Sequence, residues 1–340
     1  MKGRERSRLT RILTVVGVSV AIGALLVLAL LPAASSAARL QRQAELATSD
    51  ATCAAGENPV VPGYDPVTHE IYVPNEGAGG SPSITVYNET CQLVGSVTPS
   101  LPSDSRPWQA AFDPENNYMY VTDYGLSEVY VISGTTILDT ITGFDAPVGI
   151  TYDPTGYGMA VVNSGNNRVD FIYGTTTASV EFGFFTGSDP YEITYDPTCA
   201  GDLVTNTASD NVTVYEDTSR ALYSLPVGSS PEGIAYAGAE GEDYVANAGS
   251  NTVSVLLCTL GVEFTITGFH QPDAVAWDQA TLHIYVTNVG NGKVYVVSGE
   301  SILKKDSTAS DSGASGLAFD EFDDEMYVTG YDNDEVYVLS

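Results

Sequence analysis

Short apolar runs separated by turn residues fill the chain after residue 45. The runs are rich in β-branched and aromatic residues, as in Gly149-Ile150-Thr151-Tyr152 and Val294-Tyr295-Val296-Val297, a composition typical of strands. Glycine, proline, asparagine and aspartate bound them, as in tight turns. No segment of this part shows a convincing helical period. The pattern predicts an all-β fold.

One aromatic-Asp-Pro element repeats along this region. Its second positions, seven in number, are 48, 40, 43, 41, 41 and 42 residues apart: Asp65, Asp113, Asp153, Asp196, Ala237, Asp278 and Asp320. A proline stands six residues earlier in all but the last copy, at Pro59, Pro107, Pro147, Pro190, Pro231 and Pro272, with Ala314 in the seventh. Two further apolar runs follow in register, and a fourth leads to the next unit. Units of this length with four short strands predict a seven-bladed β-propeller over residues 59–340.

The second run of each unit carries a family signature. It reads Tyr285-Val286-Thr287-Asn288 in the sixth unit, with close variants such as Tyr120-Val121-Thr122-Asp123 and Leu203-Val204-Thr205-Asn206. The chain therefore resembles the YVTN-repeat β-propellers, often found as archaeal cell-surface or surface-layer proteins, and more loosely the NHL-type propellers. The resemblance implies fold and cell-envelope location. It says little about activity, because the repeated residues are those that build blades.

The N-terminus has the pattern of an export signal. Basic residues from Lys2 to Arg11 precede an uncharged stretch at residues 12–31, and small residues follow up to residue 38. We expect residues 1–38 to form a signal peptide or an N-terminal membrane-anchor helix, because the stretch is long enough to cross a bilayer. Cleavage and retention both remain open. In either case the rest of the chain would be extracellular, at the cell surface.

Residues 39–58 are expected to form a linker and the strand that closes the ring, because the seventh unit stops after its third strand. A gene fragment truncated before its last strand is the competing explanation. An even number of cysteines in an exported chain favours disulfides. Cys53–Cys91 and Cys199–Cys258 are the favoured pairs, and the two other pairings remain open. Asn88 and Asn211 match the N-glycosylation pattern.

Charge excludes one class of partner. The chain has 13 bases against 43 acids, a formal net charge of −30, and seven of the bases lie in residues 1–42. Binding to nucleic acid requires lysine or arginine to displace counterions, so we expect no nucleic-acid partner. The acidity can attract cations or basic partners, or keep an exported protein soluble in salt or acid. The scarcity of lysine favours the second reading.

The sequence offers little catalytic chemistry. The three histidines, His69, His270 and His283, fall on different faces of the predicted ring and cannot share one zinc ion. In three successive units an acidic residue stands one or two positions after the repeat proline: Glu192, Glu232 and Asp273. Trp108 and Tyr191 directly follow the proline of their own units. We expect these five residues near the channel mouth as a ligand-binding group, and the three carboxylates as candidate ligands for Ca²⁺ or a cationic group.

These observations favour binding over catalysis, with no catalytic residue and no required cofactor. We expect an exported cell-surface scaffold for a protein or glycan partner, with residues 12–31 as a candidate membrane tether. One alternative, implied by the NHL-type likeness, is a metal-dependent lyase or lactonase acting through Glu192, Glu232 and Asp273 at the channel mouth. A structural unit of a surface layer is a third hypothesis. Fold alone cannot choose among them.

Overall fold

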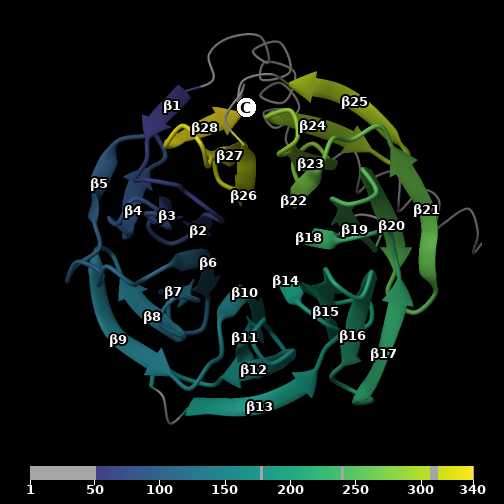
Figure 1. The fold of residues 1–340 in the computed structure, drawn as a ribbon, viewed down its shortest axis with the longest axis horizontal. Helices are drawn as coiled ribbons and strands as arrows, with labels where there is room; N and C mark the ends of the chain where they lie inside the picture. Colours follow the sequence, from purple (N-terminus) through teal and green to yellow (C-terminus); the bar gives the residue numbers. More distant parts are fainter. Residues whose placement is uncertain (1–50, 177–178, 239–240, 307–312, 340) are drawn as a thin grey trace, which may run out of the picture. The chain divides into compact units, whose positions relative to one another are not determined.

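Seven antiparallel four-stranded sheets stand around a central channel in the computed structural model (Figure 1). The structure describes residues 51–176, 179–238, 241–306 and 313–339. No helix long and apolar enough to span a membrane occurs in these ranges. The expected signal or anchor segment at residues 1–38 lies outside them. The described residues confirm the predicted seven-bladed β-propeller.

Each blade runs from an inner strand at the channel to an outer strand at the rim (Figure 1). The first three blades are β2 Gly63–Asp65, β3 Glu70–Asn75, β4 Ser83–Asn88 and β5 Leu93–Ser96; β6 Pro107–Asp113, β7 Tyr118–Asp123, β8 Glu128–Ser133 and β9 Thr136–Thr142; and β10 Pro147–Asp153, β11 Gly158–Asn163, β12 Arg168–Ile172 and β13 Val180–Phe185. The next two are β14 Pro190–Asp196, β15 Gly201–Asn206, β16 Asn211–Glu216 and β17 Ala221–Pro226; and β18 Pro231–Ala237, β19 Glu242–Asn247, β20 Thr252–Leu257 and β21 Gly261–Thr267. The last two are β22 Pro272–Asp278, β23 His283–Asn288, β24 Lys293–Ser298 and β25 Ser301–Asp306; and β26 Ala314–Asp320, β27 Glu325–Gly330 and β28 Glu335–Leu339, completed by β1 Ala51–Ala54.

The seventh blade takes its outer strand from the other end of the propeller. Strand β1 pairs antiparallel with β28, with Ala51 opposite Val338 and Ala54 opposite Glu335. Cys53 of β1 forms a disulfide with Cys91 in the β4–β5 turn of the first blade. Pairing leaves β28 without an open edge, and the disulfide fastens blade seven to blade one.

The repeated aspartate stabilises the turn that ends each inner strand. The Oδ1 atom of Asp65 accepts the backbone N–H of Val67 at 2.8 Å, and Asp153 accepts that of Thr155 at 2.7 Å. Asp113, Asp196, Asp278 and Asp320 bind the matching N–H in the same way. A side chain that binds the backbone two residues ahead stabilises a tight turn, which explains why the aspartate recurs.

The repeated threonine joins neighbouring blades. Thr205 Oγ1 accepts the N–H of Glu192 in its own blade at 3.0 Å and donates to the carbonyl of Glu232 in the next at 2.6 Å. Thr122 and Thr329 make the same inter-blade bond to Val148 and Val60. The threonine hydroxyl thus accepts a hydrogen bond within its own blade and donates one to the next blade.

Apolar side chains fill the spaces between blades. Strand residues alternate between the two faces of a blade, so Leu203 packs toward blade five while Val204 packs toward blade three. Both are fully buried. The core is therefore a ring of inter-blade layers, and each blade is stabilised by its two neighbours.

Candidate functional site

A break in strand pairing presents the predicted site residues to the channel. In the fourth blade Pro190 pairs with Asn206, but regular pairing resumes only at Ile193, opposite Val204. The same register shift follows the repeat proline in blades two, three, five and six. Bulged residues leave the ladder and turn their side chains away from it. The two positions after each proline therefore supply the lining of the channel mouth.

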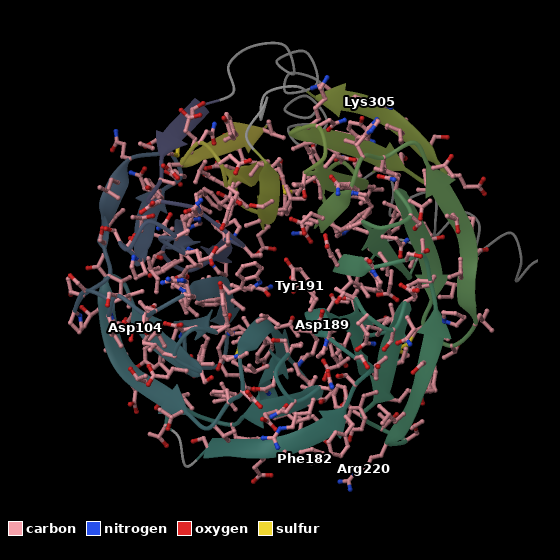
Figure 2. The ribbon with its side chains drawn as sticks, in the orientation of Figure 1. Asp104, Phe182, Asp189, Tyr191, Arg220 and Lys305 are labelled. Carbon is pink, nitrogen blue, oxygen red and sulfur yellow. A yellow bond between two sulfur atoms is a disulfide. The ribbon has the colours of Figure 1, made fainter. Side chains whose placement is uncertain are left out.

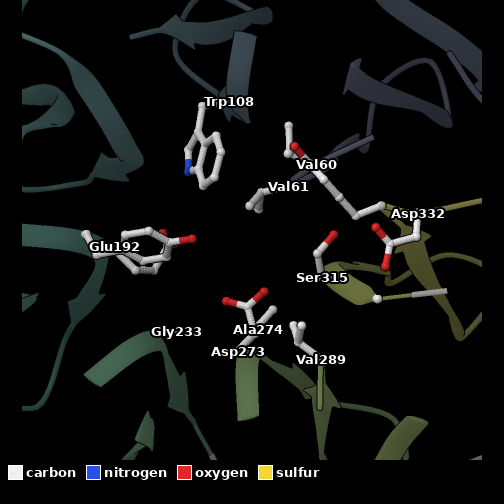
Figure 3. A pocket seen from close by; sticks show the side chains of 13 residues that line it. Val60, Val61, Trp108, Glu192, Gly233, Asp273, Ala274, Val289, Ser315 and Asp332 are labelled. Carbon is white, nitrogen blue, oxygen red and sulfur yellow. The ribbon is translucent and has the colours of Figure 1, made fainter. Parts of the chain in front are cut away.

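One pocket at this mouth, the inner pocket, has a volume of about 210 Å³ (Figure 3). Its described lining combines apolar, aromatic and acidic side chains: Val60, Val61, Trp108, Tyr191, Glu192, Gly233, Asp273, Ala274, Val289, Gly313, Ser315, Tyr331 and Asp332. Figure 3 shows the Asp273 carboxylate pointing into the same space as Trp108 and Val61. A larger outer pocket of about 610 Å³ adjoins it, sharing Trp108 and Tyr191 and adding Glu232 and Asp189.

Aromatic rings form one wall of both pockets. The Trp108 ring meets Tyr191 edge-on with centroids 5.9 Å apart, and it meets the Tyr124 ring edge-on at 5.5 Å. Tyr191 extends from β14 toward the ring centre (Figure 2). Burial, and then the charges of Asp273 and Glu232, raise the pKa of Tyr191 well above its ordinary value. Tyr191 therefore stays neutral and offers a hydroxyl beside the carboxylates.

Glu192 is held in place by a residue that the sequence analysis missed. Gln109 Nε2 of blade two donates to Glu192 Oε1 at 2.8 Å, and Gln109 Oε1 accepts the N–H of Ile150 at 3.1 Å. Burial raises the pKa of Glu192 from its ordinary 4.5 to about 7, against the opposing effect of the hydrogen bonds from Gln109 and Ile193. Near neutral pH this carboxyl group exchanges a proton readily.

Glu232 and Asp273 are neighbouring carboxyl groups. They share a hydrogen bond, and the pKa of Asp273 rises well above its ordinary value through burial, then through Glu232 and Glu192. Burial also raises the pKa of Glu232. Gly233 permits their approach, because a Cβ there would lie 2.3 Å from the Asp273 carbonyl oxygen. Two close carboxyl groups retain a proton that separated ones would lose.

Tyrosines at the rim of the mouth were also missed. Tyr124 and Tyr331 both donate to the carboxylate of Glu76, the second at 2.5 Å from Oε2. Each of the three follows the last residue of a YVTN-like run. That position lines one of the two pockets in five of the seven blades, as Tyr124, Ser164, Thr207, Val289 and Tyr331, so the repeat register could have identified the tyrosines.

The five predicted ligand-binding residues all line the mouth, but they do not gather into one closed metal cluster. Among the described side chains, the groups whose ligand atoms lie within 4.8 Å of one another do not include Glu192, Glu232 and Asp273 together. A metal at the mouth therefore stays a prediction. None of the described residues lining either pocket is a lysine, arginine or histidine, so the mouth favours positively charged groups.

The remaining predicted residues lie elsewhere. His69 contacts Phe322 between blades one and seven, with ring centroids 4.2 Å apart, while His270 precedes β22 and His283 begins β23. Cys199 and Cys258 form the second predicted disulfide. The Asn211 amide donates to Ser209 at 3.0 Å, and Asn88 ends β4. Glycosylation of the two asparagines stays a prediction.

The ring and its mouth define the class: a seven-bladed β-propeller with an acidic, aromatic-walled pocket at one end of its channel. Solved structures agree on the fold. Virginiamycin B lyase from Staphylococcus aureus is 15% identical, with a TM-score of 0.71 over 85% of this chain and 98% of that one. Hydrazine synthase from Kuenenia stuttgartiensis is 16% identical, with a TM-score of 0.67 over 83% and 95%. The Swd1 propeller domain from Myceliophteria thermophila is 8% identical, with a TM-score of 0.68 over 86% and 98%.

Sequence comparisons add nothing to this likeness. No protein-family model matches the chain, and no curated protein matches it. At these identities the structural likeness shows the propeller fold alone. It is compatible with a scaffold and with an enzyme.

Proposed function

We propose that this chain is an exported cell-surface propeller of the YVTN-repeat type that binds a protein or glycan partner at its channel mouth. The partner presents a positively charged group, such as a lysine or arginine side chain or an amino sugar. The observation that carries the proposal is the combination of Trp108 and Tyr191 with Glu192, Glu232 and Asp273 around adjoining pockets. Aromatic faces and carboxylates together attract cations.

Three further features support this assignment. Two disulfides fit an oxidising compartment, where exported proteins fold. The outer pocket, at about 610 Å³, falls within the range of about 300–1,000 Å³ that is usual for ligand sites. The propeller also keeps the carboxylates on rigid strands, which lowers the entropy cost of binding.

Tryptophan emission provides a direct test. The chain has only two tryptophans, Trp108 and Trp277, so a Trp277→Phe variant reports on the mouth alone. Titration of the full-length chain with a lysine-rich peptide and with glucosamine oligomers is expected to change Trp108 emission. The Glu232→Gln/Asp273→Asn double variant, which removes the negative charge that the pair carries, is expected to bind about tenfold more weakly, the equivalent of about 1.4 kcal/mol. Acetylation of the ligand amines supplies the matched control, and equal binding of acetylated and free amines would refute the proposal.

A lyase activity is the second candidate, supported by one residue. Glu192 lies in the inner pocket with its pKa raised to about 7, which suits a general base near neutral pH. A catalytically inactive histidine-to-alanine variant of the S. aureus lyase has been solved with quinupristin, whereas no histidine is among the described residues lining the inner pocket here.

Quinupristin is therefore the first substrate to assay. Conversion of quinupristin by the full-length chain, dependent on an added divalent ion and lost in Glu192→Gln, would support the enzyme. If the exhaustively exchanged protein neither binds nor is activated by a divalent ion, the metal-dependent enzyme is excluded.

A further inference from the structure

Three aspartates meet between blades three and four, at the end of the ring opposite the mouth. Asp153 ends the inner strand β10, Asp202 lies in β15, and Asp217 follows β16. One oxygen from each lies within 4.8 Å of the others. Asp153 and Asp202 are fully buried, and Asp217 is 9% exposed. These three residues form the Asp153 cluster.

Most of the oxygens in the Asp153 cluster have no donor facing them. Asp153 Oδ1 accepts from the Thr155 N–H at 2.7 Å and from its hydroxyl at 2.6 Å. Its Oδ2 has no hydrogen-bond partner, and neither oxygen of Asp202 or of Asp217 has one at hydrogen-bonding distance and angle. Burial and the charge of Asp153 raise the pKa of Asp217 to about 7, against a weaker opposing effect of its own N–H and of Thr155. A buried carboxylate oxygen without a partner costs considerable free energy. Five such oxygens in one cluster therefore need compensation, which either a bound cation or protons shared between the carboxyl groups can supply.

Packing does not account for an aspartate at position 202. The corresponding residue of the other blades is apolar and buried except for Asp243: Ile71, Met119, Met159, Ile284 and Met326. Asp202 shares its face of β15 with Val204, which packs on blade three. A methionine would therefore fill the same inter-blade layer, and an aspartate there is explained by what its oxygens bind.

The surroundings supply no compensating cation. Among the residues that the structure describes, none of the three aspartates forms an ion pair. The titratable groups around them are further carboxyl groups and tyrosines: Asp202 is influenced by Asp153 and Asp217, and Tyr195 by all three. Tyr173 lies near Asp153. Arg220 lies near enough to Tyr215 to lower the pKa of its hydroxyl, which burial, Tyr157 and Asp217 raise.

We propose that the Asp153 cluster binds one Ca²⁺ ion, which fastens blade three to blade four. Oxygen-only donors select a hard cation over zinc. Ca²⁺ accepts carboxylates in one- or two-oxygen mode at about 2.3–2.6 Å, so two ligands of one ion lie at most about 5 Å apart. One oxygen from each aspartate meets that limit, and the five partnerless oxygens can count toward the six to eight that Ca²⁺ takes. Mg²⁺ fits less well, because it retains several of its waters.

Thermal unfolding of the full-length chain tests the site. After exchange into EDTA and then metal-free buffer, CaCl₂ at about 100 times its Kd is expected to raise Tm by about 5 °C, and MgCl₂ by much less. Metal analysis is expected to find one Ca²⁺ per chain retained at the cluster. Asp202→Asn keeps the shape of the side chain, and it is expected to abolish the Ca²⁺-dependent rise.

Blade five provides the matched control. Asp243 occupies the position of Asp202 and faces Asp196, but the third carboxylate is replaced by Cys258, which is held in a disulfide. Asp243→Asn is expected to keep the full response to Ca²⁺.

Asp217→Asn, at the edge of the cluster, gives a second measurement if Asp202→Asn does not fold. The proposal would be overturned if Ca²⁺ did not change the Tm of the parent chain. It would also be overturned if the Tm of Asp202→Asn or Asp217→Asn still rose fully with Ca²⁺. Either result would favour shared protons in the cluster.

Discussion

At the scale of single residues, the residues that recur across the blades are explained by structural hydrogen bonds rather than by contacts with a ligand. Thr205 joins two blades, and Asp153 stabilises its turn with Oδ1. The repeated asparagine supports the mouth: Asn288 Oδ1 accepts the His270 N–H at 2.9 Å. Residues that differ from blade to blade, such as Glu192 and Asp202, therefore carry the information about function.

Glu192 makes a testable contribution to stability. Its pKa is raised in the folded chain, so its contribution is fully present below about pH 4.5, the ordinary value, and is lost as the pH rises through about 7. Glu192→Gln removes this pH-dependent loss of stability, because glutamine does not ionise. Its side-chain oxygen can still accept the hydrogen bond from Gln109. We expect the variant to be more stable than the parent by about 1–2 kcal/mol at pH 8, measured by urea unfolding.

The comparison at pH 4 serves as the control for Glu192→Gln. There the Glu192 carboxyl group is mostly protonated in both the folded and the unfolded chain, and the two proteins should agree within about 0.5 kcal/mol. A difference that does not vary between pH 4 and pH 8 would show that the carboxyl group titrates normally.

At the scale of elements, the ring closes through β1 and the Cys53–Cys91 disulfide. Beyond the pairing of β1 with β28, the Ala55 N–H donates to the Asp334 carbonyl at 2.7 Å, and Tyr87 donates to the Ala54 carbonyl at 2.5 Å. The segment before Pro59 thus contacts blades seven and one together. The closing element is short, which makes the covalent link important.

Removing this disulfide should open the ring more easily. Its cysteines are separated by 38 residues, and a loop of that size confers about 3–4 kcal/mol in the chain-entropy estimate. We expect the Cys53→Ser/Cys91→Ser double variant to lose a comparable amount of unfolding free energy in urea. Hydrogen exchange should rise first in β1 and β28.

The Cys199–Cys258 disulfide is the comparison for that experiment. It joins blades four and five inside the ring and spans 59 residues. Its removal should lower stability without selectively exposing β1. Equal exchange in β1 before and after loss of Cys53–Cys91 would show that strand pairing alone closes the propeller.

At the scale of the whole molecule, acidity dominates. The chain carries 43 acidic and 13 basic residues, and among the described part several carboxyl groups lie close together, as at Glu232 and Asp273. Like charges on a folded ring repel one another and destabilise it. The same field draws cations to the mouth and to the Asp153 cluster.

Salt should therefore stabilise the protein. Raising NaCl from 10 mM to 500 mM in EDTA shortens the Debye length from about 30 Å to a few ångströms and screens the repulsion. We expect Tm to rise by about 2–4 °C, corresponding to roughly 1 kcal/mol. At pH 4, where many carboxyl groups are protonated, the rise should be smaller. A Tm independent of salt at pH 7 would contradict this account.

The sequence alone determined the blades, because turn residues and strand runs act locally and repeat with a nearly constant period. It also placed Glu192, Glu232 and Asp273 at the mouth, since position within a repeat fixes position on the ring. Only the tertiary structure revealed the support of Glu192 by Gln109 and the meeting of Asp153 with Asp202, 83 and 49 residues apart respectively. Such contacts depend on which side chains neighbouring blades bring face to face, and no periodic pattern records that.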